Sequence, residues 1–174
     1  MIERRARGGA ALYAASIMTT STPTRRRWLA ATAGALLAPL PLRAAAPPAP
    51  RVQVWKDPSC GCCGDWVQHL QRNGYAVTVQ ATGNTAMRAR LGIASAYASC
   101  HTAVVDGYVL EGHVPVREIG RLLAERPGAL GLAVPGMPVG SPGMDGAVYQ
   151  GRRDRYEVLL LLKDGGARPF QRYG

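Results

Sequence analysis

Three of the four cysteines in this 174-residue chain stand within four residues, in the run Cys60-Gly61-Cys62-Cys63. The run follows an alternating apolar stretch at 51–56, which predicts a strand, and precedes an amphipathic stretch at 64–73, which predicts a helix. The thiols are therefore expected on a strand-to-helix turn, near the first turn of the helix. A helix N-terminus has unpaired N–H groups and a partial positive charge, and both stabilise a thiolate. The sequence thus points to cysteine chemistry.

The apolar patterns along the rest of the chain predict a small α/β domain. Alternation at 76–80 indicates a second strand, and Asn84 is a suitable N-cap for a short helix that Gly92 ends. Two apolar runs joined at Asp106-Gly107 predict a β-hairpin, because this dipeptide favours a tight turn between antiparallel strands. The expected elements are strands at 51–56, 76–80, 101–106, 108–113 and 157–163 and helices at 64–73, 85–91 and 116–125.

This order of elements is the thioredoxin-like one: β-α-β, a short helix, a β-hairpin and a further helix. We therefore expect a thioredoxin-like fold with one extra C-terminal strand, at 157–163, whose continuous apolar run indicates burial on both faces. The chemistry of such folds lies at the turn after the first strand, which is where residues 60–63 stand.

A stretch rich in Gly, Pro and Met at 127–154, here called the flap, separates the last predicted helix from the last predicted strand. It contains the near-repeat Pro135-Gly136-Met137 and Pro142-Gly143-Met144. Structureless loops of this length are uncommon in small domains and are usually functional or disordered. Because the flap also carries Leu and Val residues, we expect it to be ordered and to lie on the domain.

Residues 1–46 have the composition of an export signal. The run Arg25-Arg26-Arg27 precedes an apolar stretch at 29–42, which is followed by Ala44-Ala45-Ala46. The paired arginines, followed by a bulky apolar residue and Leu, resemble a twin-arginine signal. An uncleaved membrane anchor is the alternative, although the apolar stretch is short for a membrane span.

This interpretation divides the chain into three parts. They are an export signal at 1–46, with translation starting at Met1 or Met18, a proline-rich linker at 47–51 and a thioredoxin-like domain at 52–174. Cleavage is expected within 44–46, with no stable membrane insertion of the mature domain. The expected destination is the periplasm, where disulfides are permitted.

The net charge of +10 suggests a nucleic-acid partner, but its distribution does not. Residues 1–46 carry seven Arg and one Glu, so +6 belongs to the predicted signal and only +4 to residues 47–174. The one basic cluster there, Arg152, Arg153 and Arg155, has the character of a solvated loop. We therefore expect no nucleic-acid partner.

The cysteine run is compatible with more than one chemistry. Cys60 and Cys63 form a Cys-x-x-Cys pair, which suits dithiol–disulfide exchange, with one sulfur attacking and the other resolving. Cys62 is more than that mechanism requires, and closely spaced thiolates instead suit a soft, multiply bridged metal. Two ordinary disulfides are a further alternative, although so tight a run closes almost no loop.

The fourth cysteine, in Cys100-His101, favours the metal interpretation. Thioredoxin-like folds usually place a cis-proline just before the third strand, facing the Cys-x-x-Cys turn. That position falls near His101 here, where the chain has no proline. Cys100 should then lie against residues 60–63, so that four thiols converge from two segments with His101 at the edge.

The donor types favour copper over zinc. Structural zinc prefers four tetrahedral ligands from spaced segments, whereas Cu(I) accepts bridging thiolates and also methionine sulfur. The expected ligands are Cys60, Cys62, Cys63 and Cys100. Further candidates are His101, His113, Met137 and Met144, although a methionine more often packs than ligates and His113 can equally be structural.

Four segments carry a resemblance to known proteins: Asp57-Pro58-Ser59-Cys60-Gly61-Cys62-Cys63-Gly64, the run 99–108, Glu111-Gly112-His113-Val114-Pro115 and the run 131–144. Together they resemble the CopG-type proteins of bacterial copper-resistance clusters. The resemblance covers nearly all of residues 52–165 and implies a periplasmic, thioredoxin-like copper protein. It does not extend to the DNA-binding repressors that share the name.

The leading prediction is an exported copper protein of copper resistance. Such a protein binds Cu(I) through the Cys-x-Cys-Cys and Cys-His segments, and interconversion of Cu(I) and Cu(II) is a reasonable extension of this role. The expected partners are copper ions and other periplasmic copper-handling proteins. The alternative is a periplasmic thiol–disulfide oxidoreductase with Cys60 as nucleophile and Cys63 as resolving thiol. A disulfide-stapled binding module is a third, minor possibility.

Overall fold

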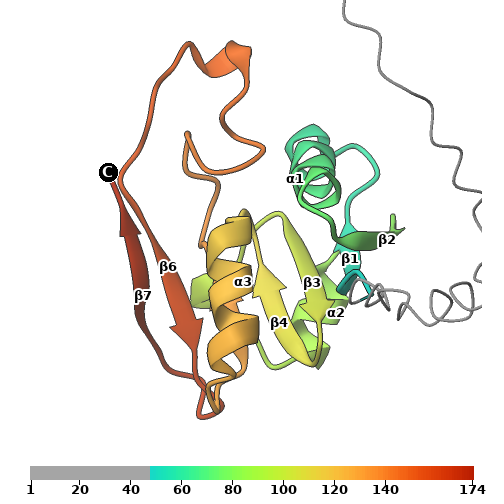
Figure 1. Cartoon of the computed structure of the whole chain (residues 1–174), viewed down its shortest axis with the longest axis vertical. Coiled ribbons are helices and arrows are strands. Elements are labelled where there is room, and N and C mark those ends of the chain that lie inside the picture. Colours follow the sequence, from blue (N-terminus) through green and yellow to red (C-terminus); the bar gives the residue numbers. More distant parts are fainter. Residues whose placement is uncertain (1–47) are drawn as a thin grey trace, which may run out of the picture. The chain divides into compact units, whose positions relative to one another are not determined.

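The strands of this protein form one seven-stranded mixed sheet, ordered β2-β1-β3-β4-β5-β6-β7, in a computed structural model that describes residues 48–174 (Figure 1). The export signal predicted at 1–46 lies outside the described residues. Three α-helices and two short 3-10 turns connect the strands. The elements are β1 Arg51–Lys56, α1 Gly61–Arg72, β2 Ala76–Gln80, α2 Thr85–Arg90, η1 Ser95–Tyr97, β3 His101–Val105, β4 Tyr108–Glu111, α3 Val116–Glu125, β5 Gly131–Ala133, η2 Ala147–Tyr149, β6 Tyr156–Leu161 and β7 Ala167–Tyr173.

Strand pairing brings the two cysteine segments together. β1 runs parallel to β2 and antiparallel to β3, and Lys56 at the end of β1 pairs with His101 at the start of β3. The turn after β1 and the loop before β3 therefore leave the sheet at the same edge. Residues 60–63 and Cys100 are neighbours for this reason, although 37 positions separate Cys63 from Cys100.

The predicted β-hairpin is present between β3 and β4. Its two turn residues, Asp106 and Gly107, have φ values of 46° and 84°. Two successive positive φ values are what a two-residue turn needs to match the twist of the strands it joins. Asp-Gly supplies them at low cost, which is why this signal could be read from the sequence.

The core lies on both faces of the sheet. On one face, α1 and α3 contribute Trp66, Leu70, Ile119 and Leu122 to a cluster with the strands. The indole Nε1 of Trp66 donates to the carbonyl of Val114 at 2.9 Å, so this fully buried ring has no unpaired polar atom. A smaller cluster, of Ile93, Val109, Ala133 and Leu161, covers the other face.

The helix predictions need two corrections. Helix α1 begins at Gly61 rather than at residue 64, so Cys62 and Cys63 lie inside its first turn and Cys60 is the N-cap residue. Glycine does not prevent a helix from starting, because the first N–H groups need no intrahelical partner. Asn84 does occupy the N-cap position of α2, but its side chain makes no capping hydrogen bond. Its amide instead donates to Ser99 and Thr102.

The sheet is larger than predicted. The flap contains the short strand β5, which pairs with β4 and β6, and a further strand, β7, follows β6 at the sheet edge. β5 has only three residues, too few for a periodic pattern, and β7 contains Pro169, which obscures its strand signal. The α/β class is confirmed, with two strands more than expected. Among residues 48–174, none of the helices combines the length and apolarity that crossing a membrane requires.

Candidate metal centre

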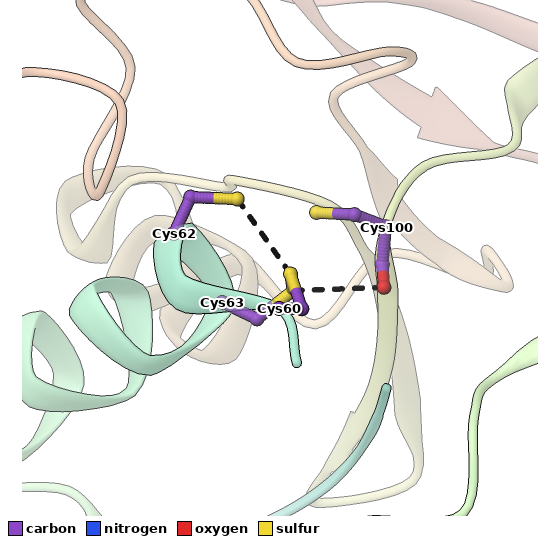
Figure 2. Close-up of side chains that lie close together, drawn as sticks. All are labelled: Cys60, Cys62, Cys63 and Cys100. Atoms are coloured by element: carbon purple, nitrogen blue, oxygen red, sulfur yellow. Dashed lines mark hydrogen bonds between the residues drawn. A yellow bond between two sulfur atoms is a disulfide. The ribbon is translucent and has the colours of Figure 1, made fainter. Parts of the chain in front are cut away.

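The four cysteine sulfurs form one group, in which every atom lies within 4.8 Å of the others (Figure 2). Cys60, Cys62 and Cys63 come from the N-terminus of α1, and Cys100 comes from the loop before β3. The predicted convergence of two segments is therefore found. Cys63 is fully buried and the other three are partly exposed, so the group lies close to the surface.

Two of the four sulfurs are joined. Cys60 and Cys63 form a disulfide with a Cα–Cα distance of 5.4 Å, and Cys62 and Cys100 are free thiols. The Cys62 sulfur lies 3.6 Å from that of Cys60, and the Cys63 sulfur lies 3.6 Å from the carbonyl oxygen of Cys100. The second contact is no hydrogen bond in this state, because a disulfide sulfur carries no proton. After reduction, the Cys63 thiol can donate to that carbonyl.

Cys100 is also part of a second group of possible ligands, with His101 and His113. Its sulfur lies 3.1 Å from His113 Nε2 and 3.3 Å from His101 Nδ1. Burial, with further contributions from the nearby Cys62, raises the pKa of Cys100 to about 12. Without metal, Cys100 is therefore a protonated thiol that can donate to an imidazole. A metal ion would have to displace that proton.

The flap sets the orientation of His113. Its Nδ1 lies 2.8 Å from the carbonyl oxygen of Pro142, which can only accept a hydrogen bond, so Nδ1 carries the proton. Burial lowers the pKa of His113, which favours the neutral ring. The lone pair of Nε2 then faces Cys100. A metal-ligating histidine is commonly fixed in this way by a hydrogen bond at its other nitrogen.

His101 is more central than the sequence indicated. Its ring is fully buried, 4.3 Å from the Trp66 ring centroid and 5.0 Å from that of His113. Burial, and secondarily the charge of a protonated His113, hold the pKa of His101 well below its usual range. Its Nε2 is buried without a hydrogen-bond partner in the described part of the chain, while Nδ1 faces Cys100.

The two candidate methionines have environments of their own. The Met144 sulfur accepts a hydrogen bond from the Tyr149 hydroxyl at 3.1 Å, in a mostly buried position. Met137 is 52% exposed and lines an open groove with Pro135 and Tyr156. Ligation by either thioether stays a prediction.

The flap lies on the domain, as its apolar composition predicted, and it contacts the cysteine turn directly. Gly143 has a φ of +85°, and a Cβ at this position would lie 2.7 Å from the Cys62 carbonyl oxygen and 2.8 Å from the Trp66 nitrogen. Only glycine allows this close approach to the first turn of α1. The glycines of the near-repeat are thus not equivalent, because a Cβ on Gly136 would meet nothing within 4 Å.

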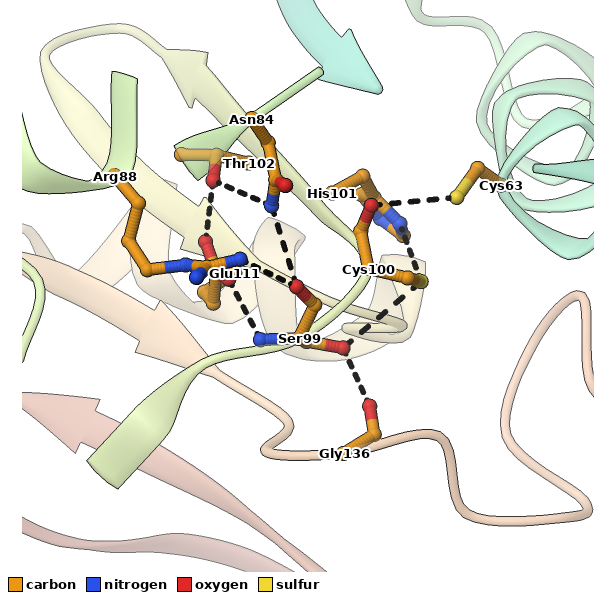
Figure 3. A network of polar contacts seen from close by, with 9 residues as sticks. All are labelled: Cys63, Asn84, Arg88, Ser99, Cys100, His101, Thr102, Glu111 and Gly136. Carbon is orange, nitrogen blue, oxygen red and sulfur yellow. Dashed lines mark hydrogen bonds and ion pairs between the residues drawn. The ribbon is translucent and has the colours of Figure 1, made fainter. Parts of the chain in front are cut away.

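A polar network around Glu111, behind Cys100, was not predicted from the sequence. Glu111, at the end of β4, is fully buried and accepts hydrogen bonds from Arg88, Ser99 and Thr102 (Figure 3). Burial raises the pKa of Glu111, and each of these three contacts opposes that shift. An acidic residue ending an apolar strand run was the available signal, but the sequence does not reveal its partners.

Comparison with known proteins places these features in a family. A family model described as "Protein of unknown function, DUF411" matches residues 97–144, and no curated protein matches. Two solved structures, described as forms 1 and 2 of "Copper resistance protein copG", are each 44% identical to this chain. The match to form 1 has a TM-score of 0.67 and spans 73% of this chain and 98% of the form 1 chain. The match to form 2 has a TM-score of 0.66 and spans 72% of this chain and 99% of the form 2 chain. With this identity over nearly the whole of both relatives, and a cysteine cluster that could bind metal, the chain belongs to the family of CopG copper resistance proteins.

Proposed function

We propose that this protein is an exported Cu(I)-binding protein whose ligands are Cys60, Cys62, Cys63 and Cys100. The observation that carries the proposal is the convergence of these four sulfurs, from two distant segments, within 4.8 Å of one another. Thiolates are the donors that select Cu(I), and a compact set of them suits bridging better than a single tetrahedral zinc.

The second group supports a larger copper site. Because Cys100 is shared between the cysteine group and the pair His101 and His113, its thiolate can bridge two metal positions. Burial lowers the pKa of both imidazoles, which favours the neutral form in which each can contribute a nitrogen lone pair. Cys100 is thus the central ligand of this proposal, and Met137 and Met144 are peripheral candidates.

The disulfide makes copper loading dependent on reduction. Opening the Cys60–Cys63 bond takes two electrons and two protons and yields two thiols, which lose their protons when they bind metal. The oxidised form keeps two thiols and two imidazoles beside each other. A site that changes its donor set in this way is suited to Cu(I)/Cu(II) interconversion, which we include in the proposal.

We also infer that the domain is thioredoxin-like. The strand order β2-β1-β3-β4, the parallel β1–β2 pair connected by α1, and the β3–β4 hairpin followed by α3 support this classification. In this interpretation β5, β6 and β7 are additions to one side of the sheet. The cysteine turn then occupies the position that thioredoxin-like proteins use for thiol chemistry.

Anaerobic reconstitution tests the proposed function. Purified residues 47–174, fully reduced and titrated with Cu(I) against a competing chromophoric chelator, should bind copper, whereas the protein with Cys60–Cys63 oxidised should bind less because two of its four thiolates are absent. Zinc should bind weakly to both. Absence of stable Cu(I) binding by the reduced protein would contradict the proposal.

A thiol–disulfide oxidoreductase is the second candidate, and one observation favours it. The Cys60–Cys63 disulfide stands at the N-terminus of α1, where the helix stabilises the thiolate released on reduction. In that mechanism the Cys60 thiolate of the reduced protein attacks a substrate disulfide, forming a mixed disulfide and releasing one substrate thiolate. Attack by Cys63 on the mixed disulfide then releases the second substrate thiolate and re-forms the Cys60–Cys63 disulfide.

Export to the periplasm by the twin-arginine route is part of the proposal, with residues 1–46 as signal, 47–51 as linker and 52–174 as the copper domain. Replacing Arg25 and Arg26 together by Lys should stop accumulation of the mature protein in the periplasmic fraction, because the twin-arginine pair is the recognised feature. Immunoblots of cell fractions measure this, with Arg4→Lys plus Arg5→Lys as the control. Undiminished periplasmic protein would instead indicate general secretion.

A further inference from the structure

The loop that carries Cys100 is held by side chains rather than by regular structure. Cys100 lies between η1 and β3, outside any helix or strand. Its neighbour Ser99 uses every polar group it has: the N–H donates to Glu111 Oε1 at 2.7 Å, the carbonyl accepts from Arg88 Nη2 at 2.6 Å and Asn84 Nδ2 at 3.2 Å, and the hydroxyl donates to the Gly136 carbonyl. The position of Cys100 therefore depends on these contacts.

Glu111 and Arg88 are the centre of this arrangement (Figure 3). The Arg88 Nε donates to Glu111 Oε1 at 2.7 Å, and the same guanidinium donates through Nη2 to Ser99. Thr102 Oγ1 donates to the second carboxylate oxygen at 2.5 Å. A buried carboxylate requires such partners, and here every one of them belongs to, or directly contacts, the segment 99–102 that contains Cys100.

Helix α2 contributes polar rather than apolar side chains to the packing. It buries none of its side chains, yet it presents Arg88 to Glu111, and its N-cap residue Asn84 contacts Ser99 and Thr102. A short helix without an apolar face is not held by hydrophobic burial. Its polar contacts to the Ser99–Thr102 segment therefore fix it, and that segment, against the sheet, together with the apolar contacts of Leu91 and Ile93 just after the helix.

We propose that Glu111 and Arg88 are positioning residues that hold Cys100 within reach of the other ligands. Only the expected effect on copper binding rests on the proposed function, because the contacts that hold Cys100 are present in the metal-free protein. Without Arg88, the Ser99 carbonyl loses a charged donor and Glu111 loses its counter-ion. The loop can then move, and Cys100 leaves its place beside Cys62 and His113.

A metal-free cross-linking experiment tests the positioning. In a Cys60→Ser/Cys63→Ser background, Cys62 and Cys100 are the remaining thiols, and a mild oxidant such as diamide should join them because their sulfurs lie within 4.8 Å. Adding Arg88→Met should slow this reaction about tenfold, the order of effect expected when a hydrogen bond from a charged group, here Arg88 to the Ser99 carbonyl, no longer holds the loop. The matched control is Arg121→Met, which removes an arginine paired with Glu125 on the exposed face of α3.

Copper binding gives the second readout. Arg88→Met in the otherwise native, reduced protein should weaken Cu(I) binding about tenfold and lower the number of sulfur ligands seen by X-ray absorption, with an unchanged circular dichroism spectrum. Asn84→Ala removes two hydrogen bonds but no charge, so it should weaken Cu(I) binding in the same direction but by less. It replaces Arg88→Met as the test variant if Arg88→Met does not fold. Cross-linking rates equal to those of the Arg121→Met control would overturn the proposal. Since cross-linking uses no metal, failure of copper binding in the native protein would refute the proposed function alone.

Discussion

Replacing Cys62 by Ser should sharply lower the amount of Cu(I) that the reduced protein retains, and Cys100→Ser should do the same. Each change removes one soft donor from a group whose four sulfurs lie within 4.8 Å, and ligands that act as a unit are lost non-additively. Cys100→Ser should have the larger effect, because Cys100 also belongs to the group with His101 and His113. Copper per chain after anaerobic desalting, in parallel with the native protein, measures both losses.

Cys62→Ser, compared with Cys60→Ser, separates copper binding from disulfide exchange. In an exchange mechanism Cys60 and Cys63 do the chemistry, so Cys62→Ser should leave insulin reduction largely intact and Cys60→Ser should abolish it. Ser59→Ala is a control near the turn, since Ser59 is exposed and its hydroxyl donates to the Asp57 carboxylate. Full copper retention by Cys62→Ser, combined with strong reductase activity, would decide for the oxidoreductase.

Gly143→Ala should detach the flap from the cysteine turn. The new Cβ would lie 2.7 Å from the Cys62 carbonyl oxygen and 2.8 Å from the Trp66 nitrogen, and both are backbone atoms of α1 that cannot move aside separately. We expect the free energy of unfolding to fall by about 2–4 kcal/mol, from the strained positive φ and the overlap together. The hydrogen bond from His113 Nδ1 to Pro142 should be lost, and Cu(I) binding should weaken with it.

The near-repeat supplies the control for this prediction. Gly136 has a similar φ of +69°, but a Cβ there meets nothing within 4 Å, so Gly136→Ala should cost only the conformational strain, about 1 kcal/mol. Urea denaturation compares the stabilities, and limited proteolysis reports whether the flap is released. Equal losses of stability in the two variants would mean that the contact between Gly143 and α1 contributes nothing.

Much of the frame around the site could be predicted from local sequence patterns. The alternating run of β1, the Asp106-Gly107 turn and the apolar face of α3 each depend on residues close together in the chain. Periodicity and turn chemistry are local properties, so they are readable without a structure. The order of these elements was also enough to predict that Cys100 would meet residues 60–63.

The finer features of the site depend on contacts between residues far apart in the chain. Pro142 is 29 positions from His113, and nothing near either residue indicates that one fixes the proton of the other. The same holds for Arg88 and Glu111, 23 positions apart. A buried polar group must find a partner, but which partner is decided only when the elements pack.

The sequence by itself therefore determined the α/β class, the helix N-terminus at the cysteine run and the identity of the four converging thiols. Only the tertiary structure decided the two added strands β5 and β7, the exact start of α1, the sharing of Cys100 between two ligand groups and the network behind it. The division has a physical cause. Secondary structure follows from short-range patterns, whereas donor geometry follows from the packing of loops onto a sheet, where each orientation depends on many distant residues at once.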